Sequence, residues 1–332
     1  MRFSRPAVTA VVFLALSASS VFAAGQAPGA ARQAEHDRII SYWTPARLAG
    51  AQPRDFVRTN GGFQPAAGKP GGGGTTSTVT GASWTKTGGQ VSKAVGKVFF
   101  HMDGSDWQCS GSVASDGRAG YSLVLTAGHC AYDETNGGFA TNWMFMPAWD
   151  LQPATFSTAC SNSLYGCWTA SALVVHSGFA SAGGFNDQAT HYDFAFAVVG
   201  TGGKDNSQLD AKVGSFPLAN LGSIATGTRM YAFGFPAAGK YHGNDLTYCA
   251  GDIIQDANNS NSTWGLACDM TGGSSGGGWF ANFNETTGSG NLGSLNSYGY
   301  SGVKNMYGPK FNSNTQDVYT AADGATSNTV VQ

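Results

Sequence analysis

Short apolar runs separated by turn residues fill the chain from about Ser83 onward. Asp-Gly, Asn-Gly, Gly-Gly and Gly-Asn pairs stand between these runs and are typical of turns. No 10–15-residue helical pattern alternates with the runs, as a parallel sheet requires, and no repeat of fixed period is present. The pattern therefore predicts an all-β fold, a barrel or a sandwich. The expected strands include Lys97–His101, Leu123–Thr126, Ala172–His176, Phe194–Val199, Arg229–Phe235 and Trp264–Cys268.

The composition excludes several classes of protein. Charged residues are 11% of the 332 residues, against about 25% in ordinary domains, and the net charge is -2. No basic excess points to nucleic acid, and no acidic run points to a disordered tail. Hydrophobic residues at 42% are enough for a true core.

Residues 1–23 read as a secretory signal peptide. Arg2 and Arg5 precede an apolar stretch, Ala7–Ala18, and small residues lead up to a cleavage site near Ala23. The alternative is a membrane anchor, but a bilayer span needs about 20 apolar residues and this stretch is shorter. We expect a secreted, extracellular protein with no membrane association after the signal is removed.

Residues 24–83 differ in composition from the rest. They hold five arginines, with a short helix expected over Glu35–Leu48 that Pro45 interrupts. A Gly-rich flexible linker, Lys69–Thr78, follows. We interpret residues 24–83 as a pro-region and linker ahead of one domain, residues 84–332; the alternative is a retained N-terminal arm.

The cysteines all lie in the later domain. An even number in an exported chain indicates three disulfides, and the absence of CxxC and HExxH motifs makes a zinc site unexpected. Six cysteines allow 15 pairings, and spacing does not choose among them. The simplest proposal pairs neighbours along the chain: Cys109 with Cys130, Cys160 with Cys167, and Cys249 with Cys268.

A serine lies in the Gly-rich segment Asp269–Trp279. Small neighbours expose the hydroxyl of Ser275 and let backbone N–H groups point at one place, where an oxyanion can form; an ordinary Gly/Ser loop has the same composition. The G-x-S-x-G pattern also fits an α/β-hydrolase, but that class needs a histidine after the serine. All six histidines precede Ser275, so the order His, Asp, Ser remains.

The candidate histidine and aspartate both adjoin apolar strands. His129 follows the run Leu123–Thr126 in the motif TAGHC, and Asp193 opens the run Phe194–Val199. A buried carboxylate needs a partner, and an imidazole N–H is a suitable one.

These motifs resemble those of the chymotrypsin-like (trypsin-like) serine proteases, most closely the secreted bacterial branch that includes glutamyl endopeptidase-like enzymes. The resemblance rests on Thr126–Cys130, Tyr192–Ala195 and Gly273–Gly277, and on the strand Cys109–Ser112, and it covers roughly residues 90–310. It implies two six-stranded antiparallel β-barrels with the active site between them. It also implies a Cys109–Cys130 disulfide beside the histidine.

The resemblance assigns roles residue by residue. Ser275 is the nucleophile, His129 the general base and Asp193 the residue that orients the imidazole. The N–H groups of Gly273 and Ser275 form the oxyanion hole. One departure is Ser274, where the family usually has an aspartate; Ser274 cannot make the ion pair that this aspartate forms with a new N-terminus.

The resemblance leaves the preferred cleavage residue open. Asp269 stands six residues before Ser275, where an acid favours Arg or Lys, and Ser297 and Tyr298 are expected on the pocket wall. We therefore expect a monomeric serine endopeptidase that acts on proteins or peptides, needs no cofactor and binds no nucleic acid. The alternatives are an inactive protease-fold binding module and a secreted β-rich adhesin.

Overall fold

The computed structural model describes Met1 and residues 28–66, 80–84, 88–152 and 158–332. The expected signal peptide and the Gly-rich run Lys69–Thr78 lie almost wholly outside these residues. In the described parts no helix is long and apolar enough to cross a membrane.

Six antiparallel strands close into a barrel in the first half of the domain. The strand order is β6-β5-β8-β9-β10-β7, and a ladder between β6 and β7 closes the ring. Valine, phenylalanine and leucine side chains fill its interior, among them Val98, Phe145 and Phe196. The strands are β5 (Val95–Met102), β6 (Ser105–Ala114), β7 (Ser122–Thr126), β8 (Thr141–Pro147), β9 (Trp168–His176) and β10 (Ala195–Val199).

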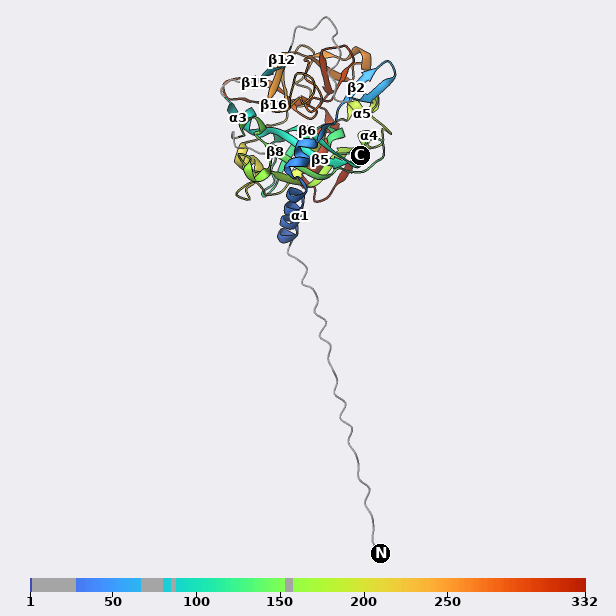
Figure 1. Ribbon diagram of the computed structural model, residues 1–332. Helices are drawn as coiled ribbons and strands as arrows, with labels where there is room; N and C mark the ends of the chain where they lie inside the picture. The colour runs from blue at the N-terminus through green and yellow to red at the C-terminus, as the bar shows by residue number, and fades with distance from the viewer. Residues whose placement is uncertain (2–27, 67–79, 85–87, 153–157) are drawn as a thin grey trace.

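Two sheets make up the second half of the domain, seen above the first barrel in Figure 1. One has the order β16-β15-β11-β12-β4, and the other β13-β14-β18-β17-β2-β3. They pack together where β12 meets β14 and β16 meets β18. Their strands are β4 (Ala82–Ser83), β11 (Arg229–Gly234), β12 (Thr247–Asp252), β13 (Ile254–Gln255), β14 (Thr263–Ala267), β15 (Gly278–Asn284), β16 (Ser289–Leu295), β17 (Tyr298–Tyr300) and β18 (Asn305–Pro309).

The expected all-β class is confirmed, and the six strands expected from the sequence are present. The ends differ by a few residues: β9 begins at Trp168 rather than Ala172, because it also pairs with β8 there. Helices are short and peripheral: α3 (Gly89–Ala94), α4 (Ser177–Ala180), α5 (Asp187–His191), α6 (Leu209–Val213), and the 3-10 turns η1 (Gly128–Cys130), η2 (Trp149–Leu151), η3 (Cys160–Asn162) and η4 (Ala257–Asn259). Near the C-terminus, α7 (Ser313–Gly324) packs on β9 and β10, and β19 (Thr329–Val331) pairs with β9.

The N-terminal segment, residues 28–66, crosses both halves of the domain. It forms α1 (Pro28–Tyr42), α2 (Pro45–Gly50), β1 (Gln52–Pro53), β2 (Phe56–Thr59) and β3 (Gly62–Pro65). The expected helix is thus broken before Pro45, where Thr44 caps α2. Trp43 and Leu48 are buried. Strand β1 pairs in parallel with β6, whereas β2 pairs in parallel with β17, so the segment bridges the two halves.

Three disulfides join the cysteines that are neighbours along the chain: Cys109–Cys130, Cys160–Cys167 and Cys249–Cys268. They are the pairs that the sequence analysis put forward. The first ties β6 to the turn that carries His129, and the third ties β12 to the end of β14. Each one restrains a local loop or hairpin rather than joining distant parts of the chain.

Candidate active site

The buried pair of His129 and Asp193 lies at one end of the first barrel. Strands β7 and β10 are antiparallel, with Thr126 opposite Ala195, so the residues beyond these strand ends meet. The imidazole Nδ1 lies 2.9 Å and 3.1 Å from the two carboxylate oxygens, and the backbone N–H of His129 donates to the same carboxylate at 2.9 Å. Both side chains are fully buried.

The geometry of this pair sets the tautomer of the histidine. An ionised carboxylate can only accept hydrogen bonds, so Nδ1 carries the proton and Nε2 presents its lone pair. Ser297 donates a further hydrogen bond to Asp193 Oδ2. A buried carboxylate with three donors is well compensated, and the imidazole is held in one orientation.

Ser275 lies on a Gly-rich loop between the two halves. Gly273 and Gly276 have φ values of +95° and +83°, which side chains rarely adopt. The loop is also held by Ser110 of β6, whose backbone N–H donates to Ser275 O at 2.7 Å and whose hydroxyl donates to Gly273 O at 2.8 Å. The nucleophile candidate is therefore fixed to the barrel that carries the histidine.

The N–H groups of Gly273 and Ser275 donate to no acceptor among the residues that the structure describes. Buried N–H groups are almost always paired, so two unpaired donors on one loop are notable. Beside a serine hydroxyl, such donors can stabilise negative charge on a carbonyl oxygen.

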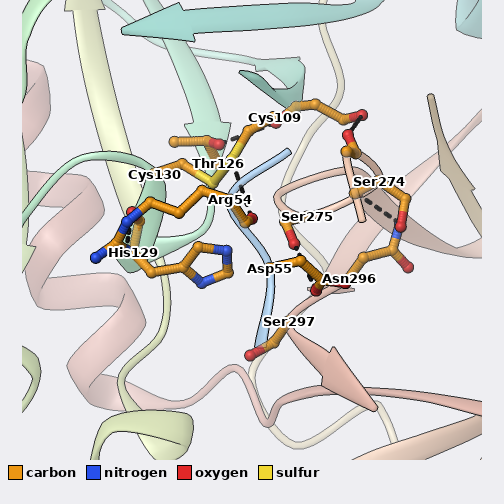
Figure 2. The surroundings of a disulfide bond; sticks show 12 residues. Arg54, Asp55, Cys109, Thr126, His129, Cys130, Ser274, Ser275, Asn296 and Ser297 are labelled. Atoms are coloured by element: carbon orange, nitrogen blue, oxygen red, sulfur yellow. Dashed lines mark hydrogen bonds between the residues drawn. A yellow bond between two sulfur atoms is a disulfide. The ribbon is translucent and has the colours of Figure 1, made fainter. Parts of the chain in front are cut away.

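Ser275 and His129 are not joined by a hydrogen bond. In the described residues, His129 Nε2 is buried with no partner. The Ser275 hydroxyl is directed instead to Asp55 Oδ1, at 3.4 Å, as Figure 2 shows. Asp55 comes from the N-terminal segment. The ring of its neighbour Phe56 packs edge to face on the His129 imidazole, with 5.4 Å between the ring centroids.

Solved structures of proteases resemble this chain over most of their own length. The protease Anisep from Arthrobacter nicotinovorans is 36% identical, with a TM-score of 0.59, and the match covers 70% of this chain and 96% of that one. The thermostable serine protease AL20, from an extremophilic microorganism, is 34% identical, with a TM-score of 0.59, covering 71% and 99%. The chain belongs to the bacterial chymotrypsin-like serine proteases.

More distant matches show the fold alone. A Glu endopeptidase is 18% identical, with a TM-score of 0.54, and covers 76% of this chain and 99% of its own. No family model matches the chain, and no curated protein does either. The family resemblance read from the motifs, and the fold that it implied, are confirmed.

Ser274 directly precedes Ser275, at the position where the family resemblance led us to expect an aspartate. The structure shows what holds the loop instead. Asn296 Nδ2 donates to Ser274 O at 3.0 Å and to Phe233 O at 2.8 Å, while its Oδ1 accepts from Trp279 Nε1 at 2.7 Å. Asn296 is fully buried, and it ties the serine loop to β11 and β15 without an ion pair. No sequence motif pointed to Asn296.

A cavity of about 590 Å³ lies beside the serine loop and includes Asp269. The Asp269 carboxylate accepts from Lys240 Nζ at 2.8 Å, from Tyr241 OH at 2.6 Å and from the Gly81 N–H at 2.7 Å. Burial opposes ionisation of Asp269, but the bonds from Lys240 and Tyr241 outweigh it and hold its pKa below the usual value. Because the Asp269 carboxylate already has these three donors within the protein, it is not a free anion that can pair with a basic side chain of a substrate.

Two residues expected on the pocket wall lie elsewhere. Neither Ser297 nor Tyr298 lines this cavity; Gly299 and Tyr300 do. The Ser297 hydroxyl is drawn to Asp193. Tyr298 is fully buried, and its hydroxyl donates to Asp256 Oδ2 at 2.6 Å. Because successive side chains of β17 alternate in direction, Tyr298 faces the interior.

One cluster of metal-ligand side chains occurs in the described parts of the chain: Cys109, His129 and Cys130. The two sulfurs are bonded to each other, so neither is a thiolate that can bind a metal. His129 Nδ1 is taken by Asp193. The cluster is the surroundings of a disulfide, shown in Figure 2, and its chemistry does not fit a metal.

Proposed function

We propose that the chain is a secreted serine endopeptidase that hydrolyses peptide bonds through His129, Asp193 and Ser275. The observation that carries the proposal is the buried His129–Asp193 pair beside a serine loop with two unpaired N–H groups. The relatives are proteases, which supports proteins or peptides as substrates. We further propose that it acts as a monomer, without a cofactor and without nucleic acid or membrane partners.

Each group has a defined part in the reaction. His129 Nε2 removes the proton from Ser275 Oγ as this oxygen attacks the peptide carbonyl, and the Gly273 and Ser275 N–H groups stabilise the oxyanion. The imidazolium then gives its proton to the leaving amine, which breaks the C–N bond and leaves an acyl-enzyme. Water, activated by the same imidazole, releases the acid and restores Ser275. Asp193 stabilises the imidazolium throughout.

The proposal includes a zymogen, with residues 1–23 as signal peptide, 24–83 as pro-region and linker, and 84–332 as the protease domain. Its support is the position of the N-terminal segment. Asp55 accepts the Ser275 hydroxyl, and Phe56 lies against His129. The segment therefore fills the space where a substrate must bind, and it separates the nucleophile from its base.

An activity-based probe tests the proposal. Secreted, processed protein is treated with a fluorophosphonate, the label is located by mass spectrometry, and a peptide library is digested in parallel. We expect label on Ser275, and loss of both label and cleavage in Ser275→Ala, because the probe needs an activated serine and an oxyanion hole. Folded, processed protein that is neither labelled nor active contradicts the proposal and favours an inactive binding module.

Docking of the N-terminal segment is expected to depend on pH through Asp55. Burial, with a smaller contribution from the Asp193 carboxylate, raises the pKa of Asp55 to about 6 against the pull of His129. A free aspartate ionises near pH 3.9. Asp55 therefore keeps its proton to a higher pH when the segment is docked than when it is free. Docking is strongest below about pH 4, weakens by up to about 100-fold as the pH rises to 6, and does not change further above pH 6.

Hydrogen exchange of residues 52–58 measures this docking in the full chain carrying Ser275→Ala, which cannot process itself. After correction for intrinsic rates, protection should fall between pH 4 and 6. Asp55→Asn in the same background is the control, and its protection should not change over this interval. Equal pH profiles for the two proteins contradict the role of Asp55.

A further inference from the structure

Glu134 is a buried acid that the proposed mechanism does not use. It lies five residues after His129, in the turn that follows η1, and 1% of its side chain is exposed. Its neighbour Asp133 is occupied by that turn, since its carboxylate accepts from the N–H groups of Thr135 and Asn136 at 3.0 and 2.9 Å. The partner that lies across from Glu134 comes from another segment.

The partner of Glu134 is Arg54 of the N-terminal segment. Arg54 Nη2 donates to both carboxylate oxygens, at 3.1 and 3.0 Å, and Nη1 donates to the carbonyl oxygen of His129 at 2.5 Å. Only 11% of the Arg54 side chain is exposed. Figure 2 shows the guanidinium reaching past the Cys109–Cys130 disulfide to the His129 turn. A carboxylate and a carbonyl of the protease domain thus form a receptor for a guanidinium.

This receptor adjoins the reacting groups. Arg54 directly precedes Asp55, whose carboxylate accepts a hydrogen bond from Ser275 Oγ. The guanidinium is therefore carried by the residue next to the one that contacts the nucleophile. A cavity of about 470 Å³ continues from Arg54 and Glu134. A substrate peptide that lies where Arg54 and Asp55 now lie places the side chain of a residue near its cleaved bond at Glu134.

Removal of the N-terminal segment leaves this carboxylate without its cation. When a substrate covers the Glu134 carboxylate again, leaving it without a partner is costly, and a charged hydrogen-bonding partner restores the balance. We propose that Glu134 and the His129 carbonyl form a subsite for an arginine side chain of the substrate, within two residues of the cleaved bond. This inference rests on the proposed function and on removal of the segment. Glu134 lines a different cavity from the one that includes Asp269.

Matched peptides test the subsite in the processed protease. They differ only in carrying arginine or citrulline, which has the same shape without the charge, at each position within two residues of the cleaved bond. At one position we expect kcat/KM for arginine to exceed that for citrulline about 10- to 100-fold, the range for a hydrogen-bonded charged group. Glu134→Gln should bring that ratio close to one.

Asp103→Asn is the matched control. Asp103 borders the same cavity, but in the described residues no hydrogen bond or ion pair joins it to Arg54, so the arginine preference should persist. Thermal unfolding confirms that both variants are folded. A ratio near one in the parent protein at every position, or a ratio that Glu134→Gln leaves unchanged, overturns the subsite.

Binding of the same peptides to Ser275→Ala whose N-terminal segment has been removed by an added protease, measured by calorimetry, separates the subsite from the peptidase activity. Preferential binding of the arginine peptide, lost on adding Glu134→Gln, supports the subsite even if the parent hydrolyses nothing, in which case the proposed function alone fails. Equal binding of the two peptides overturns the subsite whether or not hydrolysis occurs.

Discussion

Replacing Ser275 or His129 with alanine in the processed protein should lower kcat by about 10⁶-fold, and replacing both should lower it little further. The reason is that the groups act as a unit. Without Ser275 the imidazole has no hydroxyl to activate, and without His129 the hydroxyl keeps its proton at neutral pH. The loss in each variant is then the loss of the whole covalent route.

The measurement is a set of single-turnover and steady-state rates on one peptide, for the parent, both single variants and the double variant. Ser297→Ala is a useful companion, because Ser297 donates a hydrogen bond to Asp193 Oδ2 but supplies neither the nucleophile nor the base, so its loss should reduce the rate far less than either alanine. If the two single losses multiply in the double variant, Ser275 and His129 act independently, and the triad assignment is wrong.

The fold could be predicted from the sequence, and His129, Asp193 and Ser275 could be proposed as the triad, for a local reason. TAGHC, YDFA and GGSSGG each follow or precede a strand, so short motifs carry both the residue type and its place at a strand end. The order His, Asp, Ser excluded the α/β-hydrolase reading. The cysteine pairs also proved local, with sequence separations of 7 to 21 between partners.

Other parts of the site depend on contacts between distant segments, and no spacing reveals them. Asp55 and Ser275 are 220 residues apart, and Arg54 and Glu134 are 80 apart. Asn296 holds the serine loop through backbone carbonyls, which leave no trace in the sequence. Ser297 and Tyr298 were expected on the pocket wall; in the structure their hydroxyls donate to Asp193 and Asp256, and neither residue lines the cavity beside the serine loop.

The second large effect concerns the block that the N-terminal segment places on the active site. Arg54→Ala in the full chain should increase fluorophosphonate labelling of unprocessed molecules by about 100-fold or more. Truncating one partner of a buried ion pair leaves the other as an uncompensated charge, at a cost of about 3–5 kcal/mol. Here Glu134 is left buried when the segment docks, so the docked state loses that free energy relative to the undocked one.

Arg58→Ala in the same segment is the matched control. Arg58 also pairs with an acid, Asp187, but 25% of its side chain and 52% of that of Asp187 are exposed, and such surface pairs contribute about 0–1 kcal/mol. Its removal should change labelling less than about tenfold, the limit that this free energy sets. Intact mass spectrometry counts the label on unprocessed chains alone, so faster processing cannot imitate the effect. Equal labelling in the two variants would show that the buried pair does not hold the segment in place. A difference of the expected size would show that the ion pair between Arg54 and Glu134, the acid proposed to select the substrates, also holds the blocking segment on the active site.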